Sequence, residues 1–386
     1  MARKTKEELN KLCSEFGVKT LWSWSRINTY LTDKYEYYLK YILREKEDRL
    51  NGIYAVSGGH CHDVIEAFYQ GEIKYDEMLG KYEDLLFTMN LSELKYDRND
   101  AEKNEKIANK YENCIKHFFS NHKIITAPSR IEQFITVKLS DDIYCQGYID
   151  FMFIDDYIDE NGENKKRVRV VDWKTSTKYT GKKIDAECGQ LVLYAEAVRQ
   201  TFGLDIEQIS CEWNFLKYVT VAVEQKNGTV KNRHIERNIL GESLVNSAKM
   251  WLKHFGYEDD LEEYIDIMVL ENSIDKLPPE VKQKFVVDDC YIQVPLTEEK
   301  IQELKDKIIE TVADITSKEK EYEDTEDETL FWQEVTDSDA FRLATLSGYS
   351  RKLHKPYDEY LKEREMFEDK SDEEIDDDLE SFLNSL

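Results

Sequence analysis

The sequence predicts an α/β fold in which a central sheet is flanked by helices. Apolar residues recur at helical spacing through the first 120 residues, and β-branched and aromatic residues then dominate the segments 131–138 and 144–154. An amphipathic helix is expected at 187–201, between these strands and further strand-like segments. Strands that alternate with helices are typical of α/β proteins, so we assign this class to residues 1–240.

Four helices are expected before the sheet. The first covers 25–45, where isoleucine, leucine and tyrosine recur at helical spacing and Ser25 provides an N-cap. A second helix is expected at 57–69, and two charged, half-exposed helices are expected at 75–88 and 100–120. This helical part belongs to the same predicted core as the sheet.

The predicted sheet begins with the two segments named above, of which 144–154 is nearly continuously apolar. A turn signal at 159–165 separates it from a third strand at 166–173. Further strands are expected after the helix near three segments, 207–217, 219–224 and 231–238. Beyond residue 240 the chain is expected to be mostly helical, with an amphipathic helix at 297–316.

The composition excludes several classes of protein. Aromatic residues make up 12% of the 386 residues and only 5 are proline, which excludes collagen-like and wholly disordered chains. No apolar run reaches the ~18 residues of a membrane span, and the opening residues carry no secretory signal. The seven cysteines are scattered and form no Cys-x-x-Cys pair, which fits reduced thiols. We therefore expect a cytoplasmic protein, in a bacterium or a phage-infected host, without membrane contact.

The charge is strongly acidic but unevenly distributed. Acidic residues outnumber basic ones by 80 to 53, for a net charge of −27. Residues 319–386 contain 23 acids and 8 bases, whereas residues 165–183 contain eight bases and one acid. We expect three parts, which are a core at 1–240, a mostly helical region at 241–350 that packs on it, and an acidic flexible tail at 351–386.

Two acidic residues lie in predicted strands, Asp150 within an apolar strand and Asp172 at the end of another. Asp150 closes a Gly-Tyr-Ile-Asp segment, and Asp172 follows Arg-Val-Arg-Val-Val, with Lys174 two residues later. Asp172 and Lys174 alternate with the tryptophan between them, so both point to one face of the strand. A buried carboxylate is costly unless it is paired or binds a metal. Two acids beside a lysine suit metal-dependent phosphodiester hydrolysis, although Asp-x-Lys alone more often marks a surface ion pair.

Two further pairs lie on helices before and after these strands. His62 and Glu66 are four residues apart and share one helix face, whereas His60 points about 200° away from His62 by the helix period. We choose His62 as the metal ligand because imidazole suits Mn²⁺ beside carboxylates. Gln190 and Tyr194 have the same spacing and can brace the lysine or bind a nucleic-acid backbone. Each pair taken alone also fits an ordinary helix surface.

The order and spacing of these residues reinforce one another. The patterns follow in the chain as Gly58-x3-His62-x3-Glu66, Gly147-x2-Asp150, Asp172-Trp173-Lys174 and Gln190-x3-Tyr194. This arrangement resembles the RecB-like branch of the PD-(D/E)XK nuclease superfamily, over about residues 22–220. The resemblance implies a restriction-endonuclease-like core, with a mixed central sheet flanked by helices.

The resemblance also implies roles for individual residues. His62, Asp150 and Asp172 would bind Mg²⁺ or Mn²⁺, and the backbone carbonyl of Trp173 would complete the ligand set. Lys174 would be the catalytic lysine, acting together with the two aspartates. Glu66, the fourth predicted catalytic residue, would support the metal ligands or hold a second metal.

The basic segment 165–183 is the predicted DNA channel. Four of its cations are predicted to contact the DNA backbone, namely Arg169, Lys178, Lys182 and Lys183. By resemblance, Gln190 and Tyr194 would organise the lysine strand and contact DNA. A solvated strand edge protected by lysines is the alternative interpretation of the segment.

We therefore expect a Mg²⁺- or Mn²⁺-dependent deoxyribonuclease, an exonuclease on single-stranded DNA or duplex ends, in recombination, repair or replication. By resemblance, its products would carry 5′-phosphates. The first alternative is a catalytically silent nuclease-fold module that binds DNA, or a replication or recombination protein through its acidic tail. A nucleic-acid mimic is a further alternative, which rests only on the net charge. The tail itself has three interpretations: a solubilising segment, an autoinhibitory DNA competitor or a docking segment for such a partner.

One feature of some RecB-like nucleases is missing. Several of them hold an iron–sulfur cluster with one cysteine in the N-terminal helix and three near the C-terminus. Here Thr32-Asp33-Lys34 stands in that helix, and only Cys211 and Cys290 follow the predicted lysine strand and its helix. We expect no iron–sulfur cluster. The region 241–350 would then be held by packing, with four candidate residues, Phe331, Trp332, Phe341 and Leu343.

Overall fold

The computed structural model describes residues 3–47, 53–97, 100–159 and 161–333, with a few positions between 336 and 349. Phe341 and the predicted tail at 351–386 lie outside the described residues. The contacts divide the chain into two compact units. The core unit comprises the chain up to Trp24 and Ile53–Ile309, and the second unit comprises the remainder. In the described part of the chain, no helix has the length and apolar character needed to cross a membrane.

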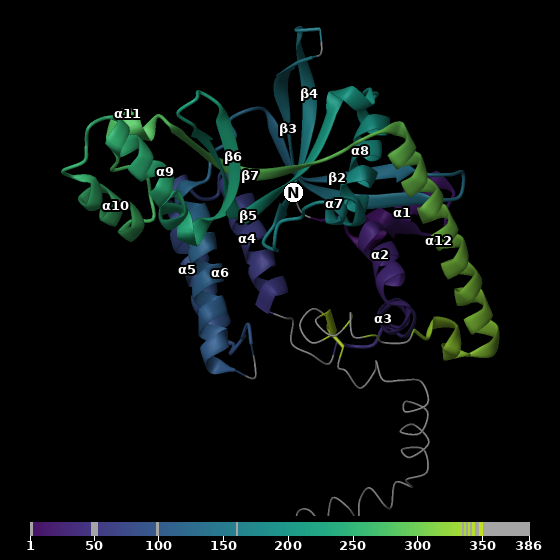
Figure 1. The fold of residues 1–386 in the computed structure, drawn as a ribbon. Helices are drawn as coiled ribbons and strands as arrows, with labels where there is room; N and C mark the ends of the chain where they lie inside the picture. The colour runs from purple at the N-terminus through teal and green to yellow at the C-terminus, as the bar shows by residue number, and fades with distance from the viewer. Residues whose placement is uncertain are drawn as a thin grey trace, which may run out of the picture. The chain divides into compact units, whose positions relative to one another are not determined.

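The core unit is built on one mixed sheet of seven strands (Figure 1). The strands are β1 (Leu21–Ser23), β2 (Ser129–Lys138), β3 (Tyr144–Ile158), β4 (Asn164–Lys174), β5 (Ile209–Glu224), β6 (Val230–Glu236) and β7 (Phe285–Val294). β3 lies antiparallel to β2 and β4, and β4 lies parallel to β5. β1 runs parallel to the start of β3, and β6 and β7 both pair with β5. This arrangement confirms the predicted α/β class with a mixed central sheet.

The pairing of β3 with β4 ends where the predicted acids begin. Phe151 pairs with Val171, and the next positions on the two strands are Asp150 and Asp172. From there β3 continues toward its pairing with β1, while β4 continues beside β5 as far as Lys174. Both acids therefore stand where two neighbouring strands separate.

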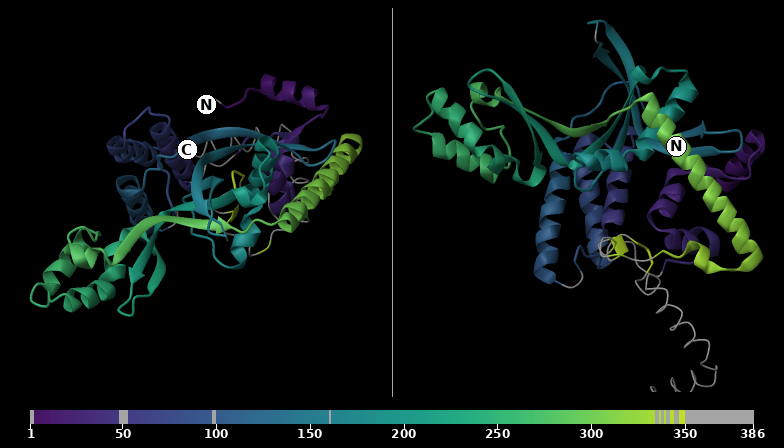
Figure 2. Two further views of the ribbon diagram at one scale, coloured as in Figure 1. Left: turned by 90° about the horizontal axis from the view of Figure 1, so that it is seen from above. Right: turned by 45° about the vertical axis from the view of Figure 1, so that its right-hand side comes forward.

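Helices cover the sheet on both sides of this point. Three of them, α4 (Ile53–Tyr69), α5 (Met78–Leu91) and α6 (Ala101–Asn121), share an apolar core with Phe151, Val171 and Trp173 of the strands. Another, α8 (Gly189–Phe202), packs on β2, β4 and β5 and follows the short helix α7 (Lys182–Glu187). β3 and β4 continue past the rest of the sheet as a hairpin (Figure 2).

The remaining helices follow β6. A second apolar core joins α9 (Leu240–His254), α10 (Leu261–Leu270) and α11 (Pro279–Lys282) to three strands. It includes residues from the end of β5, the end of β6 and the start of β7. The long helix α12 (Glu298–Thr325) follows β7, and a short α1 (Lys6–Phe16) precedes β1.

Three expectations about the elements need correction. β5 is one continuous strand where two were expected, with its irregularity between Asn214 and Val219 taken up by the pairing with β7. β7 lies in the stretch expected to be helical. The helix expected at 25–45 is instead α2 (Trp24–Thr32), α3 (Lys34–Tyr37) and a π-helical turn at Tyr38–Leu43. Asp33 interrupts it because its carboxylate accepts hydrogen bonds from the backbone of Tyr35 and Glu36 as an N-cap.

Aromatic stacking holds the second unit. Phe331 is fully buried and stacks on Tyr38, with ring centroids 5.5 Å apart, and Trp332 meets Tyr35 edge-on at 5.2 Å. The Arg342 guanidinium pairs with Asp33 at 2.8 Å, and Leu343 is buried beside it in the sequence. Three of the four predicted packing residues, Phe331, Trp332 and Leu343, thus lie within this unit.

Candidate active site

A cavity of about 540 Å³ opens where β3 and β4 separate. The helix α4 lines one side of it and Gln190 of α8 contributes on another, so both helical layers reach the ends of the strands. The predicted residues among its lining are His62, Glu66, Asp150, Asp172, Trp173, Lys174 and Gln190. The cavity therefore gathers predicted residues that are up to 128 positions apart in the chain.

The two aspartates form a buried acidic pair. Asp172 is 3% exposed, and Asp150 Oδ2 accepts a hydrogen bond of 3.2 Å from the backbone N–H of Trp173. Burial raises the pKa of Asp150, and the negative charge of Asp172 raises it further. Two carboxylates that disfavour each other's charge are a common arrangement at functional sites.

Lys174 is the cation of this group. Its Nζ lies 2.7 Å from Asp172 Oδ2. Partial burial lowers the pKa of Lys174, but the charges of Asp172 and Asp150 outweigh this and leave the pKa above its usual value. The side chain is therefore an ammonium ion at neutral pH, able to donate hydrogen bonds and unable to accept a proton.

His62 faces the same point from α4. Its Nε2 lies 3.0 Å from the backbone carbonyl of Trp173, and a carbonyl can only accept, so Nε2 carries the proton. Burial lowers the pKa of His62, which keeps the ring neutral and leaves a lone pair on Nδ1. That nitrogen lies 3.5 Å from Asp150 Oδ2. Two electron-rich atoms face each other at this distance, which favours a cation between them.

The donor set suits a hard divalent cation. Two carboxylates, one imidazole and one backbone carbonyl are the ligand types that Mg²⁺ and Mn²⁺ accept. Within the ranges that the structure describes, no three His, Cys, Asp or Glu side chains converge closely enough to form a metal site. Asp172 is instead engaged by Lys174. The residues fit such a cation by chemistry, and binding would exchange the Lys174 contact of Asp172 for a cation contact.

Gln190 and Tyr194 are joined to the strand that carries Asp150. The Gln190 amide donates to the Tyr194 hydroxyl at 3.0 Å. The Tyr194 ring lies against Gly147, where a Cβ would come within 2.9 Å of the ring carbon Cε1. A side chain at this position, three residues before Asp150, would therefore force the Tyr194 ring or β3 to move. Glu66 also lines the cavity, and its Oε1 accepts a hydrogen bond of 2.6 Å from Gln70.

The predicted DNA-binding cations fall into two groups. Lys182 and Lys183 are exposed at the start of α7, and Lys178 lies over the ring of Tyr218. Arg169 forms the second group. Its guanidinium pairs with the buried Glu212, and its side chain is only 20% exposed.

The cations at the tip of the β3–β4 hairpin are also paired. Lys165 lies 2.6 Å from Asp159, Lys166 lies 3.2 Å from Asp156, and Arg167 lies 3.0 Å from Asp155. Acids of β3 and of the turn that follows it thus neutralise the first half of the basic segment, which the count of charges along the chain does not reveal.

Arg3 and Glu132 are among the lining residues that were not predicted, whereas Tyr179, which also lines the cavity, belongs to the predicted basic segment 165–183. Glu132 is an acidic residue within the predicted strand 131–138, which also contains Gln133, Thr136 and Lys138, so its charge does not stand out in the sequence as that of Asp150 does. Tyr179 is buried against Trp213 and Phe215, and Lys183 lies over its ring at 4.9 Å.

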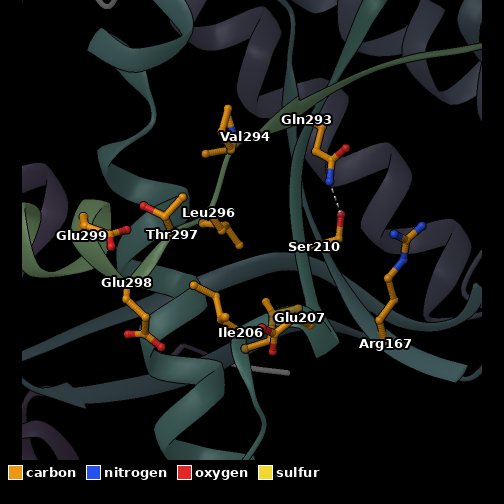
Figure 3. A pocket seen from close by; sticks show the side chains of 12 residues that line it. Arg167, Ile206, Glu207, Ser210, Gln293, Val294, Leu296, Thr297, Glu298 and Glu299 are labelled. Carbon is orange, nitrogen blue, oxygen red and sulfur yellow. Dashed lines mark hydrogen bonds between the residues drawn. The ribbon is translucent and has the colours of Figure 1, made fainter. Parts of the chain in front are cut away.

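A larger cavity of about 710 Å³ lies at the start of α12 and contains none of the predicted site residues (Figure 3). Its acidic lining residues are Glu207, Glu298 and Glu299, and its arginine, Arg167, pairs with Asp155. Gln293 donates to Ser210 there at 3.4 Å. The carboxylates of this cavity face no convergent lysine or histidine from the described lining, so it lacks the chemistry of the first cavity.

Comparison with known proteins gives one family match. The family model described as the PD-(D/E)XK nuclease superfamily matches residues 21–329, which include every motif residue that lines the first cavity. A search of the curated proteins found no match. The match covers most of the chain and extends through β7 into α12. The chain therefore belongs to the PD-(D/E)XK nuclease superfamily.

Proposed function

We propose that this nuclease is a Mg²⁺- or Mn²⁺-dependent deoxyribonuclease that acts as an exonuclease in DNA recombination, repair or replication. The observation that carries the proposal is the meeting of Asp150, Asp172 and Lys174 with His62 in one cavity. The exonuclease mode and the biological process follow from the RecB-like order of the motifs.

The cation would be held by His62, Asp150, Asp172 and the Trp173 carbonyl. When bound, it supplies Lewis acidity, which makes water a better nucleophile and offsets negative charge on the phosphate. The two aspartates would attract a cation to this position and repel competing anions. The hydrogen bond from the Trp173 backbone to Asp150 fixes the two strands at this point.

Lys174 acts as a hydrogen-bond donor in this proposal. Because it is protonated, it orients the attacking water or stabilises the additional negative charge on the phosphorane. The water oxygen forms a bond to phosphorus while the bond from phosphorus to the 3′ oxygen breaks. The products are a 5′-phosphate and a 3′-hydroxyl, since the proton lost by the water passes to solvent and the leaving 3′ oxygen takes up a proton from solvent.

The experiment uses end-labelled single-stranded and double-stranded oligonucleotides, and circular single-stranded DNA, with Mg²⁺, Mn²⁺ or a chelator. We expect cleavage of linear DNA with either cation, none with chelator, and intact circles. Asp172→Asn and Lys174→Ala should each reduce the rate by at least roughly 10²–10³-fold, the usual effect of removing one group that stabilises the transition state.

Matched controls make the same changes outside the cavity. Asp156→Asn and Lys166→Ala alter an exposed ion pair on the β3–β4 hairpin and should leave the rate within about twofold, as exposed pairs contribute little. A wild-type protein that cleaves no DNA with either cation, or an Asp172→Asn variant that stays folded and active, would contradict the proposal. Cleaved circles would show an endonuclease instead.

A further inference from the structure

Glu132 stands directly opposite Asp150 in the sheet. β2 pairs with β3 through Ile131–Phe151 and Gln133–Ile149, which places Glu132 across from the predicted metal ligand. The φ angle of Glu132 is +46°, in the left-handed region that residues other than glycine rarely adopt. Such strain persists where the surrounding structure or a function requires it.

The carboxylate of Glu132 is buried without a hydrogen bond. The residue is 8% exposed, and its Oε2 has no hydrogen-bond partner. Its ion pair is with Arg3, whose Nε lies 3.7 Å away and whose side chain is 78% exposed. A cation that is mostly in water compensates a buried carboxylate poorly.

The charges around Glu132 do not balance. Glu132, Asp150 and Asp172 line one cavity, where Lys174 contacts Asp172 at 2.7 Å and the mostly exposed Arg3 lies 3.7 Å from Glu132. Like charges placed directly across neighbouring strands repel, and burial strengthens the repulsion. Mg²⁺ and Mn²⁺ are bound by carboxylate oxygens and would remove this excess of negative charge.

We propose that Glu132 is a further ligand of the divalent cation in this cavity, beside Asp150 and Asp172. The inference rests on the proposed function, and it adds a carboxylate from β2 to a ligand set that the motifs place on α4, β3 and β4. The competing explanation is structural, in which Glu132 serves only to anchor Arg3 near the start of the chain.

The test measures Mn²⁺ binding to the full-length protein by titration calorimetry without DNA, together with thermal unfolding with and without Mn²⁺. Glu132→Gln should weaken Mn²⁺ binding at least tenfold. Without cation it should unfold at the same or a higher temperature than the wild type, because a repulsive charge is gone. The rise in unfolding temperature on adding Mn²⁺ should be smaller than in the wild type.

Two controls separate the explanations. Arg3→Gln removes the ion-pair partner and should leave Mn²⁺ affinity unchanged or increased. Glu207→Gln removes a carboxylate that lines the cavity of Figure 3 and should change neither measurement.

Three results would overturn the inference. Unchanged Mn²⁺ affinity in Glu132→Gln, with binding lost in Asp150→Asn, would refute it while leaving the proposed function intact. Equal destabilisation by Glu132→Gln and Arg3→Gln, again with unchanged affinity, would assign Glu132 the structural role. Absence of Mn²⁺ binding by the wild type would overturn both the inference and the proposed metal dependence.

Discussion

The contact between Gly147 and Tyr194 couples two motifs that lie 47 positions apart in the chain. Gly147→Ala would place a methyl group 2.9 Å from Tyr194 Cε1 and 3.2 Å from its hydroxyl oxygen, so the ring or β3 must move. We expect a loss of roughly 1–3 kcal/mol in the free energy of unfolding, as in other overpacked sites. We also expect at least a tenfold lower kcat, since small displacements of aligned groups are costly. Urea denaturation and steady-state DNA cleavage measure the two effects.

A second substitution tests whether Tyr194 is the cause. In a Tyr194→Leu background the clashing ring is absent, so Gly147→Ala should cost at least about 1 kcal/mol less than in the wild type. The double-mutant cycle would show no coupling if the methyl group instead disturbs β3 by itself.

At the residue scale, the motif spacing could predict which side chains share a face, because each spacing corresponds to a local geometry. Asp172 and Lys174 share a strand face, and His62 and Glu66 share a helix face, so their convergence follows from the sequence. The pairing of Arg169 with Glu212 did not follow, because it joins two strands through the fold. Glu132 was missed because it breaks the alternation of its strand.

The buried positions of β2 show this break. They are 132, 135 and 137, so the buried positions change from even-numbered to odd-numbered residues after Glu132, where φ is positive. If the strand alternated regularly, the Glu132 side chain would point to the face opposite the one that Ile135 and Val137 bury. Nothing in the sequence indicates the change of backbone conformation that directs this carboxylate into the cavity.

At the scale of elements, DNA binding should depend on the loop after β4 and on α7, and not on the β3–β4 hairpin. The double substitution Lys182→Ala and Lys183→Ala removes two exposed cations near the cavity. We expect roughly three- to tenfold weaker binding of a single-stranded oligonucleotide in chelator at 0.1 M salt, because each phosphate contact adds to the affinity. The dependence of log K on log salt should fall by about 1.4, or ~0.7 for each contact.

The hairpin provides the matched control. Lys165→Ala with Lys166→Ala makes the same change of charge in adjacent lysines, but these side chains already pair with Asp159 and Asp156. Fluorescence anisotropy should show affinity within about twofold of the wild type. Equal loss in both double variants would show that total charge, and not position, governs binding.

Most elements could be predicted because their apolar periodicity is regular, as in α4, α6 and α8. β7 was missed because two acids, Asp288 and Asp289, interrupt its apolar pattern. Asp289 is nevertheless buried, since it pairs with the buried Arg237 that follows β6. A partner 52 positions away therefore permits a charge inside a strand, and local patterns cannot show this.

At the scale of the whole molecule, the net charge of −27 separates into parts with different consequences. Residues 165–183 carry seven more positive than negative charges, but ion pairs within the β3–β4 hairpin neutralise the charges nearest its tip. The effective basic surface is thus smaller and closer to the cavity than the count suggests. We expect the acidic excess of residues 319–386 to repel DNA, because uncompensated charges act on phosphates over about 10 Å at 0.1 M salt.

This repulsion leads to a prediction for the acidic C-terminal segment. Residues 367–386 contain nine acids and one base, so their deletion removes eight negative charges from the molecule. We expect kcat/KM for a single-stranded oligonucleotide to rise roughly two- to fivefold at ~20 mM salt, since electrostatic repulsion slows association. The difference should vanish at ~0.3 M salt, where screening is strong. A matched variant that keeps the length but replaces the nine acids with serine and glutamine should behave like the deletion.

The salt dependence distinguishes the three interpretations of the segment. An increase that persists at high salt would indicate a direct autoinhibitory contact with the DNA site. An unchanged rate at every salt concentration would leave the segment without influence on catalysis, as expected of a solubilising or partner-binding sequence. A larger effect of the deletion than of the neutralised variant would show that the apolar residues near Leu379, Phe382 and Leu383 contribute beyond charge.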